Sequence, residues 1–310
     1  MPTASEASAQ ALDPVGVIGL GQMGLPVALR LLAAGYPVFG CSRRPPTQEF
    51  LDAGGQACRT PAEVADRCPA VVTLLPAADA LTQVAGGLSG TTRRDGIWLE
   101  MSTIGEQAKR TAAEQVAGQD WNMLDCAVSG TPAELKADRA MIFSSGSRHA
   151  HDQALPVLQV VSPKVCYVGE FGAGIRAKYI VQLLLAGHSL IAAEALALAR
   201  GAGLPLDDII GWVAGSITSS AVFEQRGPQV LAPVGPDRGN SRARRLAADL
   251  TDVKQLARQV GVRTPALDQA LAHLEALGEQ SADEPIVALY RLLAPSRVHG
   301  ARSAGTAEGT

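Results

Sequence analysis

The first pattern with chemical meaning is a glycine-rich run, Gly19-Leu20-Gly21-Gln22-Met23-Gly24, which matches G-x-G-x-x-G. It lies between an expected strand at Val15–Ile18 and an expected helix at Leu25–Ala34, and another strand is expected at Val38–Cys41. The unit spans about 30 residues, as a βαβ dinucleotide fingerprint requires. Glycines allow a tight turn and let the backbone approach a pyrophosphate, which then rests on the helix N-terminus. The pattern predicts a cofactor turn built from Gly19, Leu20, Gly21, Gln22, Met23 and Gly24.

The end of the second expected strand carries a signal for the type of dinucleotide. An NAD-binding chain places Asp or Glu there, roughly 20 residues beyond the glycines, to hold the ribose 2′-hydroxyl. This chain has Ser42, Arg43 and Arg44 at that point and no carboxylate. Guanidinium groups bind phosphate through paired, charge-assisted hydrogen bonds. We therefore expect NADP as the cofactor, with its 2′-phosphate at these three residues.

Three later segments resemble the motifs of one enzyme family. Glu100-Met101-Ser102-Thr103-Ile104 resembles a "D-x-S-T" strand end, and Asp125-Cys126-Ala127-Val128-Ser129-Gly130 resembles a "D-x-P-V-S-G-G" substrate loop. Gly172-Ala173-Gly174-Ile175-Arg176-Ala177-Lys178 resembles a "G-x-G-x-x-x-K" helix start. With the glycine run, these segments make the chain similar to the β-hydroxyacid dehydrogenases, relatives of 3-hydroxyisobutyrate dehydrogenase and 6-phosphogluconate dehydrogenase. The resemblance covers about Val15 to Leu293.

The resemblance implies that Lys178 is the general acid/base. Gln182 follows it four residues later, so the two side chains share one helix face. Glutamine at that position is typical of the L-threonate dehydrogenase-like branch of the family. Burial in an apolar helix and the positive charge of oxidised nicotinamide would both lower the pKa of the lysine. A neutral amine can take a hydroxyl proton while hydride leaves for the cofactor. The implied reaction is hydride transfer between NADP(H) and a small 3-hydroxy acid or short aldonate.

The family's motifs also imply the other ligand contacts. The substrate loop would bind a carboxylate through backbone N–H groups and hydroxyls, and Arg226 either pairs with a carboxylate or forms a surface salt bridge. The implied substrate-binding residues are Ser129, Gly130, Thr131, Gln182, Phe223 and Arg226. The implied cofactor residues outside the glycine run are Ser42, Arg43, Arg44, Asp249 and, on the nicotinamide side, Leu75, Pro76 and Thr103.

The chain departs from the family's pattern at positions expected near the ligands. Thr131 replaces the second glycine of the substrate loop, Ala248 replaces the lysine of a "K-D-L" motif, and Val222 stands where the threonate branch commonly has tryptophan. Two other functions remain open. An imine reductase shares the fold and the NADP preference but usually carries Asp or Tyr at the lysine position. A non-catalytic cofactor-binding module tends to lose the lysine. Lys178 argues against both.

Strands and helical patterns alternate in the first half of the chain, which is typical of a parallel sheet with helices on both faces. We expect an α/β fold with a Rossmann-type doubly wound sheet over 14–170. An all-helical domain for substrate binding and dimerisation follows over 171–296, joined by a long central helix. Segments 1–13 and 297–310 are expected to be disordered tails. The expected strands are Val15–Leu20, Pro37–Cys41, Ala70–Leu75, Gly96–Met101, Asn122–Cys126, Met141–Ser144 and Lys164–Val168.

The central helix, expected from Ile175 to about Arg200, is apolar on nearly every face, so it should be buried all round. It would be roughly 39 Å long, and one small domain can hardly cover such a length. We therefore expect a homodimer or homotetramer in which a second subunit covers part of this helix.

Composition and charge limit which kinds of partner, other than the substrate and cofactor, the protein is expected to have. A net charge of −3 and a pI near 6.0 argue against a nucleic acid or an anionic membrane as the main partner. The uncharged stretch Tyr179–Ala193 is short for a membrane span, which needs about 20 residues. Five cysteines without a CxxC pair are typical of reduced thiols in a cytoplasmic protein. His149 and His151 lie in an expected loop without a cluster of other ligands, so we expect no metal site.

Overall fold

A computed structural model describes residues 13–232, 242–277 and 285–294. The chain divides into two compact units, Met1–Lys178 and Tyr179–Thr310. The tails expected at 1–13 and 297–310 lie outside the described residues, apart from Asp13.

The first unit is built on one eight-stranded sheet with the strand order β3-β2-β1-β4-β5-β6-β7-β8. All neighbouring strands are parallel except β6 and β7, which are antiparallel. The strand order reverses direction between β1 and β4, and ligands of such sheets bind beyond the carboxyl ends of the strands at this switch point. The strands are β1 (Val15–Ile18), β2 (Val38–Cys41), β3 (Gln56–Ala57), β4 (Ala70–Thr73), β5 (Ile97–Glu100), β6 (Asn122–Ser129), β7 (Met141–Ser145) and β8 (Val165–Tyr167).

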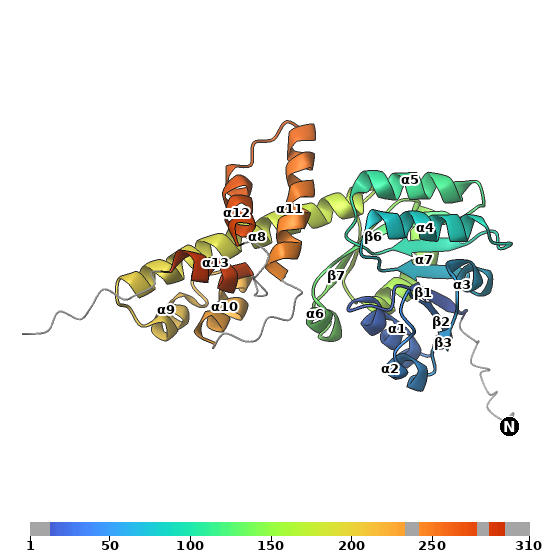
Figure 1. The fold of residues 1–310 in the computed structure, drawn as a ribbon, viewed down its shortest axis with the longest axis horizontal. Helices are drawn as coiled ribbons and strands as arrows, with labels where there is room; N and C mark the ends of the chain where they lie inside the picture. Colours follow the sequence, from blue (N-terminus) through green and yellow to red (C-terminus); the bar gives the residue numbers. More distant parts are fainter. Residues whose placement is uncertain (1–12, 233–241, 278–284, 295–310) are drawn as a thin grey trace, which may run out of the picture. The chain divides into compact units, whose positions relative to one another are not determined.

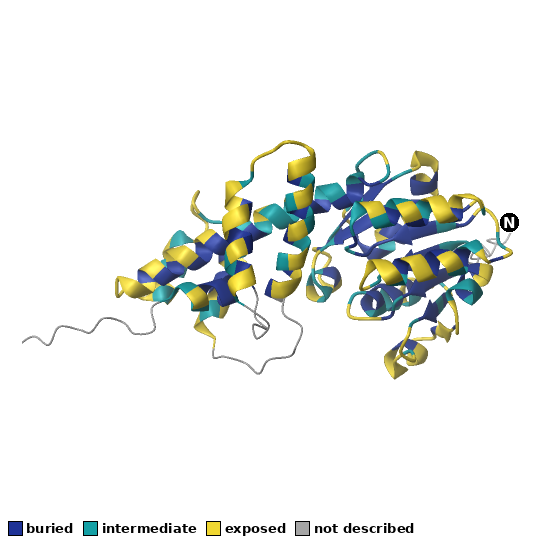
Figure 2. Ribbon diagram, turned by 45° about the horizontal axis from the view of Figure 1, so that its top comes forward, coloured by how far each residue is buried: buried dark blue, intermediate teal, exposed yellow. Residues whose placement is uncertain are grey.

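Helices cover both faces of this sheet, so each face has its own apolar core (Figure 1). Side chains of the central strands alternate between the two cores: in β1, Val17 packs on one side and Ile18 on the other, and in β5 Leu99 and Trp98 do the same. Figure 2 shows the strands as buried and the outward faces of the helices as exposed. One core includes residues of α1 (Gly24–Ala33), α6 (Pro132–Lys136) and α7 (Arg148–Val161), and the other includes residues of α3 (Pro61–Arg67), α4 (Ala78–Ser89) and α5 (Glu106–Ala117). A short helix, α2 (Gln48–Asp52), follows β2.

Helices make up the described part of the second unit. Its α13 is buried over 285–290, and the hydroxyl of Tyr290 accepts a hydrogen bond from Arg200 Nη1 at 3.0 Å. The elements are the greater part of α8 (Ala173–Gly201), then α9 (Leu206–Val213), α10 (Ala221–Arg226), the 3₁₀ helix η1 (Gly227–Leu231), α11 (Arg242–Gln259), α12 (Pro265–Ala276) and α13 (Pro285–Leu293).

The long helix α8 is only partly covered within the chain. Its exposed large apolar side chains are Ile180, Leu184, Ile191 and Leu198, which are 53–75% exposed. Among the described residues it is the one helix long and apolar enough to cross a membrane, and 39% of its most apolar 18-residue window is buried. A core helix of a soluble protein passes the same test of length and composition, so this finding is weak evidence for a membrane.

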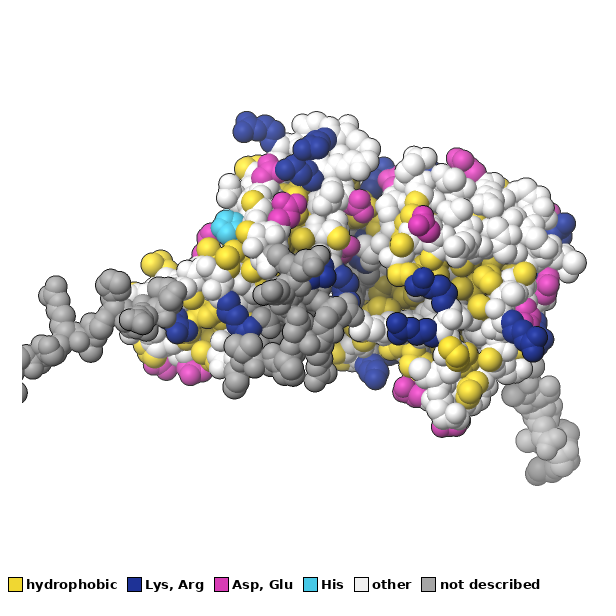
Figure 3. All heavy atoms as spheres, viewed as in Figure 1, with side chains coloured by type: hydrophobic (Ala, Val, Ile, Leu, Met, Phe, Trp, Pro, Cys, Tyr) yellow, Lys and Arg dark blue, Asp and Glu magenta, His cyan; other side chains and the backbone are white. Residues whose placement is uncertain are grey.

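Charged side chains of both signs lie on the face of the molecule that Figure 3 shows. On the face drawn in Figure 3, Lys and Arg side chains are interspersed with Asp and Glu rather than gathered in one field. This mixture agrees with the small net charge of −3.

The structure corrects two expectations about secondary structure and adds one strand. His149 and His151 lie in α7 and not in a loop, because Ser147 caps the helix N-terminus by accepting a hydrogen bond from Ala150 N. The sheet is not wholly parallel, since β7 returns antiparallel to β6. The two-residue strand β3 was not expected from the sequence; both of its residues are exposed.

Candidate active site

The glycine run forms the turn between β1 and α1. Gly19 has a φ of +99°, and a Cβ there would meet the carbonyl oxygen of Leu74, so only glycine suits this backbone. A Cβ on Gly24 would meet the carbonyl oxygen of Gly19, which shows how closely the helix start packs on the turn. Gly21 faces open space. These three positions match the separate roles that the glycines of a dinucleotide fingerprint have.

The first turn of α1 suits an anion. It has no side-chain cap at Met23 and no acidic residue, so neither a capping residue nor a carboxylate of this turn competes for its N-terminus. Backbone N–H groups and the helix dipole attract a phosphate at such an end. The described residues therefore fit the pyrophosphate of a dinucleotide at this turn.

Ser42, Arg43 and Arg44 follow β2 directly, at the same carboxyl edge of the sheet. Both arginines are exposed, and within the described part of the chain neither forms an ion pair. The Ser42 hydroxyl donates to the carbonyl oxygen of Arg44 at 2.6 Å, which fixes the turn. The two guanidinium groups are thus available to a ligand phosphate.

Hydrogen bonds connect the segments that follow β1, β4 and β5. Leu74 N donates to the carbonyl oxygen of Ile18 at 3.0 Å, and Leu75 N donates to Ser102 Oγ at 2.7 Å. Leu75 is half-buried and Pro76 is exposed. The predicted nicotinamide-side residues Leu75, Pro76 and Thr103 therefore belong to adjoining loops at one edge of the sheet.

Lys178 is the last residue of the first unit and lies near the start of α8. The residue is only 6% exposed, and its Nζ donates a hydrogen bond to Thr103 Oγ1. The structure thus brings together the predicted acid/base and one predicted nicotinamide-side residue. The hydroxyl of Thr103 is an acceptor that suits either an ammonium or a neutral amine.

The predicted substrate loop joins β6 to α6. Gly130 has a φ of +146°, and a Cβ there would lie 2.9 Å from the Cβ of Ala140, so a side chain would not fit. Thr131, which departs from the family's glycine, caps α6: its hydroxyl accepts from Glu134 N at 3.1 Å, and its backbone N–H donates to Glu134 Oε2 at 2.7 Å. This capping box uses the Thr131 N–H but leaves the hydroxyl proton able to donate. Ser129 is half-buried and Gly130 is exposed.

Two predicted ligand residues meet within the second unit. Gln182 Nε2 donates to Asp249 Oδ2 at 2.7 Å, so the amide oxygen of Gln182 remains an acceptor for another group. Phe223 is buried, and Arg226 is half-buried at the end of α10. Val222, beside Phe223, is also half-buried.

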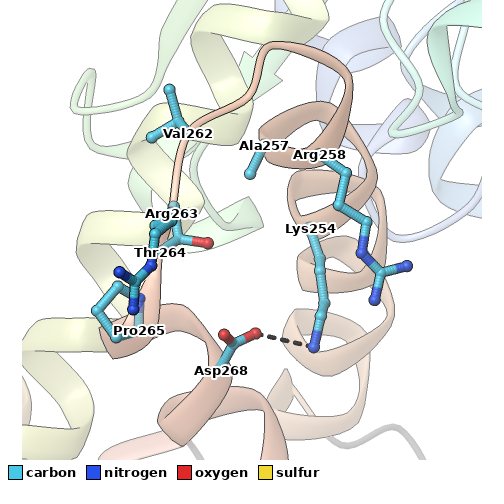
Figure 4. A pocket seen from close by; sticks show the side chains of 8 residues that line it. All are labelled: Lys254, Ala257, Arg258, Val262, Arg263, Thr264, Pro265 and Asp268. Carbon is cyan, nitrogen blue, oxygen red and sulfur yellow. Dashed lines mark ion pairs between the residues drawn. The ribbon is translucent and has the colours of Figure 1, made fainter.

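The second unit contains a cavity of about 330 Å³ between α11 and α12 (Figure 4). No residue of the predicted site lines it. Its one ion pair joins Lys254 Nζ to Asp268 Oδ1 at 2.8 Å, so part of its positive charge is neutralised. We assign no ligand to this cavity. It is lined by Lys254, Ala257, Arg258, Val262, Arg263, Thr264, Pro265 and Asp268.

Sequence reasoning missed Lys109, which lies fully buried in α5 beside the site. Its Nζ contacts Glu100 Oε2 at 2.8 Å and Asp125 Oδ1 at 2.7 Å. A signal was present in the sequence, because Lys109 shares a helical period with the buried residues Ala112 and Val116. A lysine on the apolar face of a helix indicates a buried partner of opposite charge.

Comparisons with known proteins match both halves of the chain. The NAD binding domain of 6-phosphogluconate dehydrogenase matches residues 14–169. The NAD-binding domain of NADP-dependent 3-hydroxyisobutyrate dehydrogenase matches residues 172–293. Together these matches cover nearly the whole described chain.

Curated relatives include an L-threonate dehydrogenase of Cupriavidus necator, 36% identical over 70% of this chain and 75% of its own length. The mitochondrial 3-hydroxyisobutyrate dehydrogenase of Mus musculus is 29% identical over 84% of this chain and 80% of its own length. Among solved structures, a 3-hydroxyisobutyrate dehydrogenase from Salmonella typhimurium is similar with a TM-score of 0.78 and 29% identity, covering 91% of this chain and 100% of that one. The chain is therefore a member of the β-hydroxyacid dehydrogenase family, an oxidoreductase with an NAD(P)-binding Rossmann domain that acts on CH–OH groups.

Proposed function

We propose that this protein is an NADP-dependent dehydrogenase of short hydroxyacids in which Lys178 is the general acid/base. The observation that carries the proposal is the buried Lys178, whose Nζ donates to Thr103 Oγ1 at the carboxyl edge of the sheet. The glycine turn after β1 lies at this same edge. A proton-transfer group and a dinucleotide turn at one sheet edge are what a dehydrogenase requires.

A nicotinamide cofactor bound to this protein would accept or supply the hydride. In the oxidation direction, Lys178 Nζ in its neutral form takes the proton of the substrate hydroxyl. In the reduction direction, the ammonium returns that proton to the carbonyl oxygen. Thr103 Oγ1 holds Nζ in place through the hydrogen bond between them.

We propose NADP over NAD because Ser42, Arg43 and Arg44 stand where an NAD enzyme needs a carboxylate. Both guanidinium groups are exposed and without an ion pair among the described residues, so neither has to leave a protein partner to bind a phosphate. The glycine turn and the uncapped start of α1 would hold the pyrophosphate.

The proposed substrate is a small acid with a hydroxyl group, a 3-hydroxy acid or a short aldonate. The exposed loop at Gly130 offers backbone N–H groups for the carboxylate, and Ser129 and Thr131 offer hydroxyls. The family's motif adds Gln182 as a proposed substrate residue, and its amide oxygen is chemically able to accept a hydrogen bond from a hydroxyl. Relatives named L-threonate dehydrogenase support a polyhydroxy acid.

A panel assay tests this proposal. The purified protein is incubated with NADP⁺ or NAD⁺ and L-threonate, D-threonate, 3-hydroxyisobutyrate, 3-hydroxypropionate, D-glycerate or L-serine, and NAD(P)H absorbance is followed. We expect turnover of at least one acid with NADP⁺. A cyclic imine with NADPH is assayed beside them. Reduction of the imine without oxidation of any acid would assign the chain to imine reduction, and no turnover at all with either class would favour a cofactor-binding module.

We also propose that the protein acts as a homodimer or a larger homo-oligomer, with α8 in the subunit contact. Ile180, Leu184, Ile191 and Leu198 recur on this helix at intervals of four, seven and seven residues and are all exposed. Such a heptad-like stripe packs well against an identical helix. A second copy of the chain is therefore the proposed partner of this surface, and no nucleic-acid or membrane partner is proposed.

A further inference from the structure

A row of buried polar residues crosses four strands of the sheet. Thr73 pairs in register with Glu100, Glu100 with Asp125, and Asp125 with Ser145. All four residues are fully buried. Lys109 of α5 contacts the two carboxylates in the middle of the row. An isolated buried charge is very unfavourable, so this arrangement depends on its internal pairing.

Lys109 is the one cation paired with Glu100 and Asp125 among the described residues, with no exposed surface on any of the three side chains. Burial alone would lower the pKa of the Lys109 ammonium, but the charges of Glu100 and Asp125 outweigh it and raise the pKa above its ordinary value. Lys109 is therefore charged at every pH at which the enzyme would work.

Glu100 holds the loop that carries Thr103. The backbone N–H of Ser102 donates to both oxygens of the Glu100 carboxylate, at 3.0 and 3.2 Å. Ser102 Oγ in turn accepts the hydrogen bond from Leu75 N. The backbone immediately before Thr103 is thus tied to a carboxylate whose own position Lys109 fixes.

Asp125 holds the start of α8, which carries Lys178. Its Oδ2 accepts from Ile175 N at 2.7 Å, and the neighbouring Ser145 Oγ accepts from Gly174 N at 2.9 Å. These two bonds cap the first turn of the helix, where a carboxylate also interacts favourably with the helix dipole. Lys178 lies three residues beyond Ile175, within one turn of this cap.

We propose that Lys109 is a positioning residue for the reaction: by joining Glu100 to Asp125 it sets the distance between Thr103 and Lys178. The two residues lie 75 positions apart in the sequence. A catalytic group must be held within about 0.5 Å of its working place, which requires support from packed and hydrogen-bonded neighbours. The Lys109 ammonium contacts both Glu100, which holds the loop of Thr103, and Asp125, which holds the start of α8.

This inference rests on the proposed role of Lys178, and one set of variants tests the two separately. The set is Lys109→Met, Lys178→Ala, the double variant and Val116→Ala, a control that removes core packing from the same helix without touching the polar row. We compare kcat and KM for the acid found in the panel, the NADPH dissociation constant, thermal midpoints, and amide hydrogen exchange of segments 100–104 and 172–178.

We expect Lys109→Met to lower kcat about 10- to 100-fold, the range for a misplaced catalytic group, with KM and NADPH binding changed little. In the Lys178→Ala background the same substitution should lower kcat no further, because Lys109 acts through Lys178. The backbone amides of segments 100–104 and 172–178 should exchange hydrogen faster in Lys109→Met than in Val116→Ala. If Lys109→Met does not fold, Glu100→Gln is used instead, since it preserves the side-chain shape and the Lys109–Asp125 pair.

Four outcomes separate the positioning role of Lys109 from the proposed role of Lys178. A kcat equal to that of Val116→Ala, or an additive loss in the double variant, would overturn the positioning role. Equal exchange of the two segments in Lys109→Met and Val116→Ala would overturn it without reference to activity. Normal turnover by Lys178→Ala would instead contradict the proposed function, and the exchange measurement would still decide whether Lys109 holds the two segments.

Discussion

At the scale of single residues, the proposed preference for NADP depends on two exposed side chains, Arg43 and Arg44. Changing Arg43 and Arg44 together to Ala should remove most of the preference for NADP(H) over NAD(H). A charge-assisted hydrogen bond contributes about 1.5–3 kcal/mol, or roughly ten- to a hundredfold in affinity. The measurement is kcat/KM for both cofactors in the unchanged protein and in the double variant.

Arg139→Ala serves as a control, because Arg139 is an exposed arginine of the same unit away from β2. It should leave the cofactor preference unchanged. Equal kcat/KM for NADP(H) and NAD(H) in the unchanged protein would contradict the assignment of the arginines to a 2′-phosphate.

The candidate site was predictable residue by residue where a motif fixes the local chemistry. The glycine run makes specific demands on the backbone, and the geometry of Gly19 and Gly24 agrees with them. The role of Lys178 stays a prediction, which its hydrogen bond to Thr103 supports. The polar row was not predictable, because register across strands joins residues such as Thr73 and Ser145 that are far apart in the sequence. The sequence alone does not show which strands become neighbours in the sheet.

At the scale of elements, α5 anchors the start of α8 through contacts of very different exposure. Lys109 forms a buried contact with Asp125 of β6 at 2.7 Å, and the other carboxylate oxygen of Asp125 accepts a hydrogen bond from Ile175 N of α8. Glu106 forms a partly exposed pair with Arg176, at 3.4 Å. Breaking a buried pair leaves an uncompensated charge inside the protein, whereas an exposed pair is screened by water.

Lys109→Met should therefore lower the free energy of unfolding by about 3–5 kcal/mol, and Glu106→Gln by less than about 1 kcal/mol. Because the folded-state pKa of Lys109 is raised, its stabilising contribution is fully present below the ordinary lysine pKa of about 10.4 and is lost as pH rises through the folded value. The difference between the unchanged protein and Lys109→Met should then be constant from pH 6 to pH 9.

Urea unfolding followed by circular dichroism at several pH values measures these differences. Equal losses of unfolding free energy in Lys109→Met and Glu106→Gln would mean that burial does not decide the strength of these contacts. A difference that grows steadily between pH 6 and pH 9 would mean that another group controls the effect.

The helices and strands were predictable to the extent that each carries its own pattern. Apolar runs predicted seven of the eight strands, and the segment after the glycine run predicted a helix at Leu25–Ala34, which agrees with α1 at Gly24–Ala33. The strand β3 has two exposed residues and no apolar signal. The helix α7 was missed because its first turn is polar and Pro156 lies inside it, although its buried residues follow a helical period.

At the scale of the whole molecule, the apolar stripe on α8 predicts the oligomeric state. The unchanged protein should have at least the mass of a dimer at micromolar concentration, since stable subunit interfaces commonly bury over about 2,000 Å². Replacing both Ile191 and Leu198 by Glu should shift it towards the monomer, because charged groups on a packed helix face must be desolvated.

Analytical ultracentrifugation measures the mass of each form. Val262→Glu is the matched control, as Val262 is an apolar residue 56% exposed that does not lie on α8. It should leave the mass unchanged. A monomer mass for the unchanged protein at micromolar concentration, or recovery of the protein only with membranes, would contradict a subunit contact through α8.

The measurement that tests the central claim most directly is the activity of two variants of Lys178. Lys178→Ala should lower kcat by at least about 10²–10⁴-fold, the usual contribution of general acid/base catalysis, while the NADPH dissociation constant barely changes. Lys178→Arg should fail as well, because a guanidinium keeps its proton at any working pH and cannot act as the base. If Lys178→Arg kept more than about a tenth of the activity, its loss of kcat would be far smaller than the loss expected without an acid/base. Lys178 would then supply a charge and not transfer a proton. Loss of NADPH binding in Lys178→Ala would make Lys178 a cofactor contact and contradict its role as the acid/base.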